Sequence, residues 1–223
     1  MKILRYWHWD MPQKINGAAV FVDVFAAATN IALILSKFPT VIILVNRSNI
    51  DAMRRKYPDS VLIGESASGH IRFDYPHMPV SFIDADLMGK TVLFMSINGT
   101  AVVEKALATG AAPVLIAGYV NMSATLRFLR TLQIPECMFL MSGDENSPTV
   151  EDEKFVMDFS QLANGGIPDW STSERDSRTF MSGFYGRQAD DPNFSIVFSR
   201  DKYPYPAVCR KNPDGSVVLY VPV

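Results

Sequence analysis

The chain has 223 residues, of which 48% are hydrophobic and 20% are charged, and its formal net charge at pH 7 is -2. This composition excludes a disordered chain, and because no Gly/Ser linker or charge block divides the sequence, we expect one domain over residues 1–223. A net charge near zero lacks the clustered Lys and Arg that bind nucleic acid by counterion release, so no nucleic-acid partner is expected.

The apolar stretch 18–35 raises the alternative of a membrane span. Asp23, Thr29 and Asn30 interrupt it, and a charge at the centre of a span costs about 2.5–3.5 kcal/mol. A buried strand followed by a helix over 26–37 accounts for the same residues without that cost. We therefore expect no membrane partner.

The start of the chain and the cysteines bear on the compartment. Residues 1–11 lack the long apolar core of a secretory signal. Cys137 and Cys209 lie far apart, each in an apolar run, which favours buried free thiols over a disulfide framework or a zinc site. We expect a cytoplasmic protein.

A repeated pattern of strand, turn and helix runs along the chain. Short apolar runs end abruptly in small or polar residues at 18–24, 61–63, 91–96, 113–119 and 138–141. Helix-like segments follow four of these runs, at 26–37, 100–108, 122–132 and 150–163. Continuous Val, Ile and Leu runs alternating with helices predict an α/β fold, layered α/β/α with a mostly parallel or mixed central sheet. The last third predicts a helix over 170–187, a short closing helix over 190–199 and terminal strands.

The turns after these strands are the predicted site. In open α/β sheets, ligands bind beyond the carboxyl ends of the strands, where helix N-termini favour anions. The same turns carry carboxylates, namely Asp23, Glu65, Asp144, Glu145, Glu151 and Asp152. A hard cation such as Mg²⁺, held by one or two carboxylates plus ligand phosphate, reconciles the two kinds of group. The pattern therefore predicts phosphoryl chemistry on a small anionic substrate.

Each candidate residue in the first two thirds of the chain has a structural alternative. Asp23 ends an apolar strand, where a buried carboxylate needs a cation or several hydrogen bonds, and the alternative is a carboxylate that caps the following helix. Glu65 binds metal or water, or else pairs with a Lys or Arg at the rim. The Asn98-Gly99-Thr100 turn forms an anion cradle, a helix N-cap or both.

Two further groups of residues stay open in the same way. Glu151 and Asp152 begin a predicted helix, where acidic residues stabilise the helix dipole without any catalytic role. Since adjacent helical positions do not share a face, at most one of them is expected to reach a central site. His77 is a candidate acid or base, although histidines in turns are more often structural.

Taken together, the order and spacing of these motifs resemble the magnesium-dependent 2-phosphosulfolactate phosphatases of coenzyme M biosynthesis and their bacterial relatives. The resemblance rests on VFVDV (20–24), LIGES with Gly69 (62–69), FDYPHMP (73–79), the NGT turn (98–100), AGYVN (117–121), SGDENSPTVEDE (142–153) and DDPNFSIVF (190–198). It implies an α/β fold, a Mg²⁺ site and release of phosphate from a small phosphorylated hydroxy acid.

Carried over residue by residue, the resemblance assigns two sets. The catalytic and metal-binding set is Asp23 and Glu65, with Glu151 or Asp152 as a further metal ligand. The phosphate-binding set is Asn98, Gly99, Thr100 and Asn121.

The chain departs from the family pattern at two positions that usually carry Arg, where it has Ala26 and Ala101. Because Ala cannot replace a guanidinium that binds an oxyanion through two hydrogen bonds, we expect weaker binding of a doubly charged ligand. The alternative hypothesis is therefore a non-catalytic relative that binds a small anion or a protein partner. The sequence leaves a homo-oligomer open.

Overall fold

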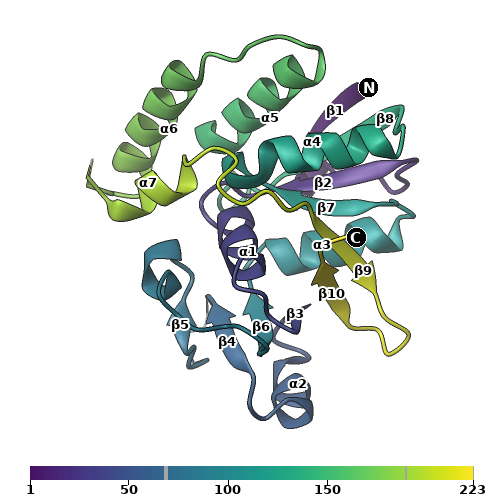
Figure 1. The fold of residues 1–223 in the computed structure, drawn as a ribbon, viewed down its shortest axis with the longest axis vertical. Helices are drawn as coiled ribbons and strands as arrows, with labels where there is room; N and C mark the ends of the chain where they lie inside the picture. The colour runs from purple at the N-terminus through teal and green to yellow at the C-terminus, as the bar shows by residue number, and fades with distance from the viewer. Residues whose placement is uncertain (68–69, 189, 223) are drawn as a thin grey trace.

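The fold is a single mixed sheet with helices packed on it. The computed structural model describes residues 1–67, 70–188 and 190–222, so that Gly69 of the resemblance lies outside the described residues. Ten strands of the described residues form the sheet in the order β1-β8-β2-β7-β9-β10-β3-β6-β4-β5 (Figure 1). In chain order they are β1 (Lys2–Trp7), β2 (Ala18–Val22), β3 (Val41–Leu44), β4 (Val61–Gly64), β5 (Tyr75–Pro76), β6 (Thr91–Met95), β7 (Val114–Ala117), β8 (Glu136–Met141), β9 (Ala207–Lys211) and β10 (Val217–Tyr220).

The sheet consists of two parallel blocks that run in opposite directions. Strands β1, β8, β2 and β7 are mutually parallel, as are β3, β6, β4 and β5. Between them lies the hairpin β9–β10, which pairs antiparallel with β7 on one side and with β3 on the other. The predicted α/β class with a mostly parallel or mixed sheet is confirmed.

Twist decides where the strand ends lie. In a flat sheet, the carboxyl ends of the two blocks would point to opposite edges. Adjacent strands rotate by about 20–25°, and the five steps from β2 to β6 therefore turn one block against the other by roughly 100–125°. In Figure 1 the arrowheads of β4 and β6 accordingly point up toward the block that contains β2 and β7. The polar turns of both blocks can then meet.

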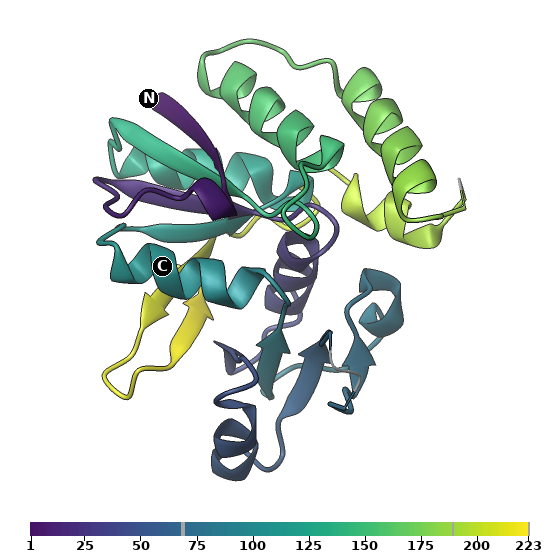
Figure 2. The ribbon, with the colours of Figure 1, turned by 180° about the vertical axis from the view of Figure 1, so that it is seen from behind.

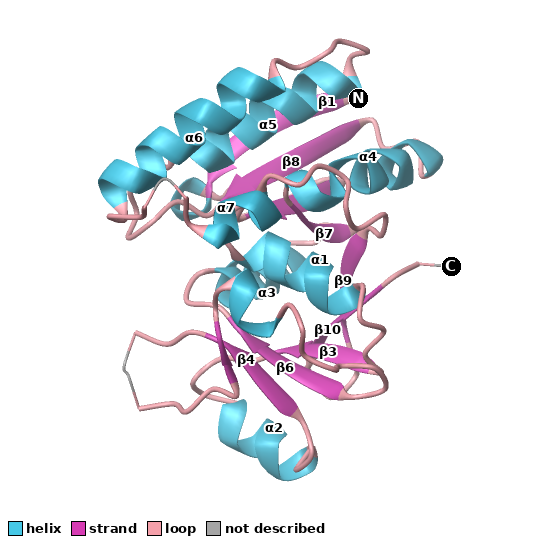
Figure 3. Ribbon diagram, turned by 60° about the vertical axis from the view of Figure 1, so that its left-hand side comes forward, coloured by secondary structure: helices cyan, strands magenta, loops and turns pink. Residues whose placement is uncertain are grey.

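Helices cover both faces of the sheet (Figure 3). The α-helices are α1 (Ala27–Leu35), α2 (Ile50–Lys56), α3 (Gly99–Ala108), α4 (Met122–Thr131), α5 (Val150–Ala163), α6 (Trp170–Phe184) and α7 (Pro192–Val197), with short 3-10 turns at His8–Asp10, Pro79–Phe82 and Tyr119–Asn121. In β2, Phe21 packs into the core cluster shared with α1 and α3, whereas Val20 and Val22 pack with α4 and α5. This alternation is what a strand buried on both faces produces.

The stretch that resembled a membrane span is divided between β2 and the fully buried helix α1. Thr29 in α1 donates a hydrogen bond from its hydroxyl to the Val24 carbonyl (3.0 Å), and the Asn30 side-chain amide donates to the His77 carbonyl (3.4 Å). In the described ranges, no helix is long and apolar enough to cross a membrane.

Candidate active site

A cleft of about 410 Å³ lies where the carboxyl ends of the two blocks meet. Residues just after β2, β4, β6 and β8 line it, and they include Asp23, Glu65, Ser96, Asn98, Ser142 and Asp144. A further wall comes from Phe25, His77, Met78, Tyr185 and Arg187. Of the predicted site residues, the structure thus brings Asp23, Glu65 and Asn98 together.

Asp23 follows β2 directly, and it both caps the helix α1 and lines the cleft. Its Oδ1 accepts a hydrogen bond from the Ala27 amide in the first turn of α1 (3.2 Å), as a helix-capping carboxylate does. The same side chain lines the cleft. Burial, and after it the negative charges of Asp152 and Glu65, raise the pKa of Asp23 well above its usual value. The Ala27 amide and a hydrogen bond with Ser142 favour the charged form but do not offset these effects, so a cation beside Asp23 would stabilise the carboxylate.

Glu65 enters the cleft from the end of β4. Its side chain is 37% exposed, and its Oε1 lies 3.8 Å from Nε2 of His77. Burial lowers the pKa of His77, although the charge of Glu65 acts in the opposite direction. Among the described residues, the ion-pair contact of Glu65 is therefore with a histidine that favours the neutral form, and not with the Lys or Arg of the alternative interpretation.

Gly64 fixes the direction in which Glu65 leaves the strand. Its φ is +148°, and a Cβ at this position would overlap the Met95 carbonyl oxygen of β6. The Glu65 amide donates to the same carbonyl (3.0 Å). Only glycine lets the two backbones approach so closely at this point.

We expect Gly64→Ala to lower the free energy of unfolding by about 2–4 kcal/mol, since it adds backbone strain to a steric overlap with β6. For a chain of this size, that corresponds to a melting temperature lower by roughly 4–16 °C, measurable by thermal unfolding. Gly165→Ala is the control. This glycine also has a positive φ of +81°, but nothing lies within 4 Å of the added Cβ. Equal losses in both variants would show that overlap with β6 contributes nothing.

Asp152 connects the turns after β2 and β8. It is 2% exposed, and its two oxygens accept hydrogen bonds from the Val24 amide (2.9 Å) and the Gly143 amide (3.1 Å). Burial raises its pKa to about 6, although these hydrogen bonds favour the charged form. Because both oxygens already hold backbone amides, Asp152 positions the two turns that carry Asp23 and Ser142.

Glu151 is equally buried and is outside the residues that line the cleft. Its Oε2 has no hydrogen-bond partner within the described part of the chain. Burial, followed by the charge of Asp152, raises the pKa of Glu151 well above its usual value. Asp23, Asp152 and Glu151 are therefore neighbouring carboxyl groups whose negative charges repel one another beside the cleft.

The Asn98-Gly99-Thr100 turn begins α3 at the cleft edge. Asn98 lines the cleft, with its Nδ2 3.5 Å from Ser142 Oγ. Asn98 occupies the N-cap position of α3 without a capping hydrogen bond from its side chain, and the Gly99 amide donates instead to Ser96 Oγ (3.2 Å). Thr100 is buried and donates its hydroxyl to the Val45 carbonyl (3.2 Å), so its hydroxyl holds α3 against the end of β3.

Asn121 lies outside the cleft lining and is fully buried. Its Oδ1 accepts from the Gly118 amide (3.0 Å) and its Nδ2 donates to the Ile116 carbonyl (3.2 Å). The side chain thus closes the turn between β7 and α4, and the structure does not bring it to Asp23.

The donor set fits a hard cation. Mg²⁺ typically takes one or two carboxylates and completes its octahedron with water and substrate phosphate. Within residues 1–67, 70–188 and 190–222, no group of three or more His, Cys, Asp and Glu side chains forms a complete metal-ligand set. A site in which Asp23 and Glu65 are the two protein ligands needs no third side chain, so it is compatible with this absence. A cation bound there would relieve the repulsion that raises the pKa of Asp23.

Tyr185 and Arg187 are cleft residues that sequence reasoning missed. They follow α6, which Figure 2 shows side by side with α5. The sequence offers only a weak signal for them. Two aromatic residues and an Arg lie close together in FYGR (184–187), but this region lacks the repeated pattern of strand, turn and helix.

Comparison with known proteins gives a consistent result. The 2-phosphosulpholactate phosphatase family matches residues 8–191. A probable 2-phosphosulfolactate phosphatase of Thermoplasma acidophilum is 32% identical over 161 residues, which cover 70% of each chain. Another of Thermoplasma volcanium is 35% identical over 61% of this chain and 63% of its own. A third, of Caldicellulosiruptor saccharolyticus, is 26% identical over 89% of this chain and 84% of its own. The chain belongs to the 2-phosphosulpholactate phosphatase family.

Proposed function

We propose that the protein is a Mg²⁺-dependent phosphatase that hydrolyses the phosphate monoester of a small hydroxy acid resembling 2-phosphosulfolactate. The observation that supports this most directly is the convergence of a desolvated Asp23 with Glu65 and Asn98 in one cleft. In the reaction, water adds to phosphorus, the bond to the ester oxygen breaks, and the leaving oxygen takes a proton to become the alcohol. The buried free thiols of Cys137 and Cys209 suit a reducing cytoplasm.

In this proposal, Asp23 and Glu65 hold Mg²⁺, and Asp152 positions the turn that carries Asp23. When bound, Mg²⁺ neutralises charge on the phosphoryl oxygens and on the leaving oxygen. Asn98 donates its side-chain amide to the phosphate. The Gly99 amide at the start of α3 already donates to Ser96, so Asn98 is the donor that this turn offers to the phosphate. Thr100 and Asn121 keep these turns in place.

His77 contributes a neutral imidazole to the cleft lining, next to Glu65. Its Nδ1 is buried and has no hydrogen-bond partner within the described residues, whereas its Nε2 is directed toward Glu65. We propose that it orients the Glu65 carboxylate.

The test is phosphate release from 2-phosphosulfolactate, 2-phospholactate and 2-phosphoglycolate, with Mg²⁺ and with EDTA. We expect turnover that rises with Mg²⁺ and stops with EDTA. The alternative, a non-catalytic binder motivated by Ala26 and Ala101, predicts ligand-induced thermal stabilisation without phosphate release. Absence of release from all three esters at saturating Mg²⁺ would contradict the proposed activity.

A further inference from the structure

Among the described residues that line the cleft, Arg187 is the only one with a positively charged side chain. The same lining contains four carboxylates, Asp23, Glu65, Asp144 and Glu145. The Arg187 side chain is 30% exposed and belongs to the wall that follows α6, whereas Asp23 and Glu65 follow strands. The cleft is therefore acidic on its strand side and cationic on its α6 side.

The guanidinium is held in place without all its donors being used. Its Nη1 donates to Asp191 Oδ2 (3.1 Å), its Nη2 lies 3.2 Å from the Met78 sulfur, a weak acceptor, and its plane lies over the Phe25 ring at 5.1 Å. A guanidinium has five N–H donors. Several donors thus stay available on a group that is already oriented for an oxyanion.

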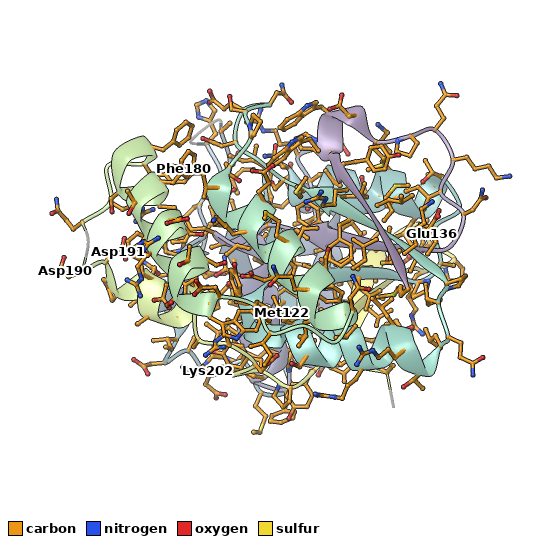
Figure 4. All side chains as sticks on the ribbon, turned by 90° about the horizontal axis from the view of Figure 1, so that it is seen from above. Met122, Glu136, Phe180, Asp190, Asp191 and Lys202 are labelled. Atoms are coloured by element: carbon orange, nitrogen blue, oxygen red, sulfur yellow. The ribbon has the colours of Figure 1, made fainter. Side chains whose placement is uncertain are left out.

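The partner of Arg187 is itself anchored. Asp191 is 10% exposed, and its Oδ1 accepts from the Asn193 amide and from the Asn193 side chain, both at 2.8 Å. The Oδ1 of Asn193 in turn accepts from the Val80 amide (3.0 Å), which ties α7 to the segment that contains Met78. Figure 4 labels Asp191 at this end of the molecule, far from Glu136 at the opposite end. An ordered set of contacts thus positions the Arg187 head group.

The two positions where the resemblance expects arginine cannot take this role. Ala26 is 1% exposed, so that an arginine side chain there would have no room. Ala101 is exposed, but it lines a neighbouring pocket with Asn46 and Arg47, and not the cleft of Asp23. Among the described residues that line the cleft of Asp23 itself, Arg187 is the one that supplies a positive charge.

We propose that Arg187 binds a second anionic group of the substrate, a carboxylate or sulfonate near the phosphate ester, and so selects doubly anionic esters. This rests on the proposed phosphatase function. The phosphate faces the strand side, where Mg²⁺ and Asn98 are proposed to bind it, and the second oxyanion faces the guanidinium. A fork of N–H donors binds carboxylate and sulfonate oxygens through paired hydrogen bonds.

The experiment compares three esters of similar size: 2-phosphoglycolate, 2-sulfoethyl phosphate and 2-hydroxyethyl phosphate, which has no second charge. For each protein, kcat/KM for the two charged esters is divided by kcat/KM for the uncharged one. We expect Arg187→Gln to lower both ratios about 10- to 100-fold, as loss of a charge-assisted hydrogen-bond pair predicts. Arg187→Lys should give an intermediate ratio, because it keeps the charge and loses the fork. A fall for only one charged ester identifies the group that Arg187 recognises.

Arg178→Gln is the matched control. Arg178 also makes an (i, i+4) ion pair, with Glu174, lies over an aromatic ring, Phe194, at 5.1 Å, and is 31% exposed, but it does not line the cleft. Its ratios should equal those of the wild type. Unchanged ratios in Arg187→Gln, or equal loss for all three esters, would overturn the inference. If the wild type releases no phosphate, the proposed activity fails. The affinities of the three esters in the presence of Mg²⁺ are then measured by calorimetry, and the ratio of charged to uncharged ester is taken from these affinities.

Discussion

Asp23→Asn should lower kcat for Mg²⁺-dependent phosphate release by about 10³-fold or more. This substitution removes the negative charge that we propose as the central Mg²⁺ ligand, and loss of a single preorganised electrostatic group commonly costs 10²–10³ in rate. The asparagine Oδ1 can still accept the hydrogen bond from the Ala27 amide, so the start of α1 is kept. The measurement is phosphate release at saturating Mg²⁺.

The same substitution should stabilise the metal-free protein. Burial and the charges of Asp152 and Glu65 disfavour ionised Asp23, and a neutral amide removes these costs. We expect a gain of about 0.5–2 kcal/mol, or roughly 1–8 °C in melting temperature with EDTA present. A residue that weakens the empty fold and is needed for turnover is typical of a functional site.

Asp158→Asn is the matched control for Asp23→Asn. Asp158 is also buried, at 4% exposed, and its oxygens accept hydrogen bonds from the Tyr119 hydroxyl (2.9 Å) and the Ser173 hydroxyl (3.0 Å). It lies outside the cleft lining, so its replacement should leave kcat within about threefold of the wild type. If Asp23→Asn keeps more than about a tenth of the activity, Asp23 is not the central metal ligand.

The sequence predicted the elements whose signals are local. The helices expected at 100–108, 122–132 and 150–163 are observed as α3, α4 and α5 with boundaries that differ by at most one residue. Each begins directly after a polar turn and ends where its apolar face ends, so nearby residues determine it. The turns after β2, β4 and β6 are local in the same sense, which is why Asp23, Glu65 and Asn98 could be singled out.

Elements that depend on tertiary pairing were missed. β1 (Lys2–Trp7) is an edge strand that pairs only with β8, and its Lys2 and Arg5 interrupt the apolar run that was used to find strands. The reversal of direction between the two blocks depends on where the hairpin β9–β10 inserts, which no local pattern encodes. The turns after β2, β4, β6 and β8 do line one cleft, but the sequence did not predict that twist between two opposed blocks brings them together.

Side-chain direction was a second obstacle. An Asn-Gly-Thr turn gives the residue types of an anion site, but the packing of α3 against β3 decides that the Thr100 hydroxyl points to the Val45 carbonyl. Likewise, Asp191 and Asn193 orient Arg187 only because α7 docks on the segment around Val80. Such long-range contacts determine the α6 side of the cleft.

Magnesium should stabilise the protein strongly at about pH 7.5 and weakly at about pH 4. Asp23, Asp152 and Glu151 all have pKa values raised by burial, that of Asp152 to about 6. Near pH 4 the raised pKa keeps a proton on Asp23, the proposed ligand, and Mg²⁺ must displace this proton to bind. Near pH 7.5 fewer protons compete with the metal, and at 100 times its dissociation constant Mg²⁺ adds about 2.7 kcal/mol. Calorimetric melting with Mg²⁺ and with EDTA at both pH values measures this difference.

In the metal-free protein, the raised pKa values make the free energy of unfolding depend on pH. Consider a carboxyl group whose pKa is higher in the folded protein than in the unfolded chain. At pH values between these two pKa values, the folded protein binds more protons than the unfolded chain does. For Asp152 this window extends from about pH 4 to about pH 6, and its contribution to stability is fully present below the window and is lost as the pH rises through it. The shift of about two pKa units corresponds to a loss of about 3 kcal/mol. Asp23→Asn should reduce the Mg²⁺ response at both pH values, and a wild-type response of equal size at both would mean that Mg²⁺ does not bind Asp23.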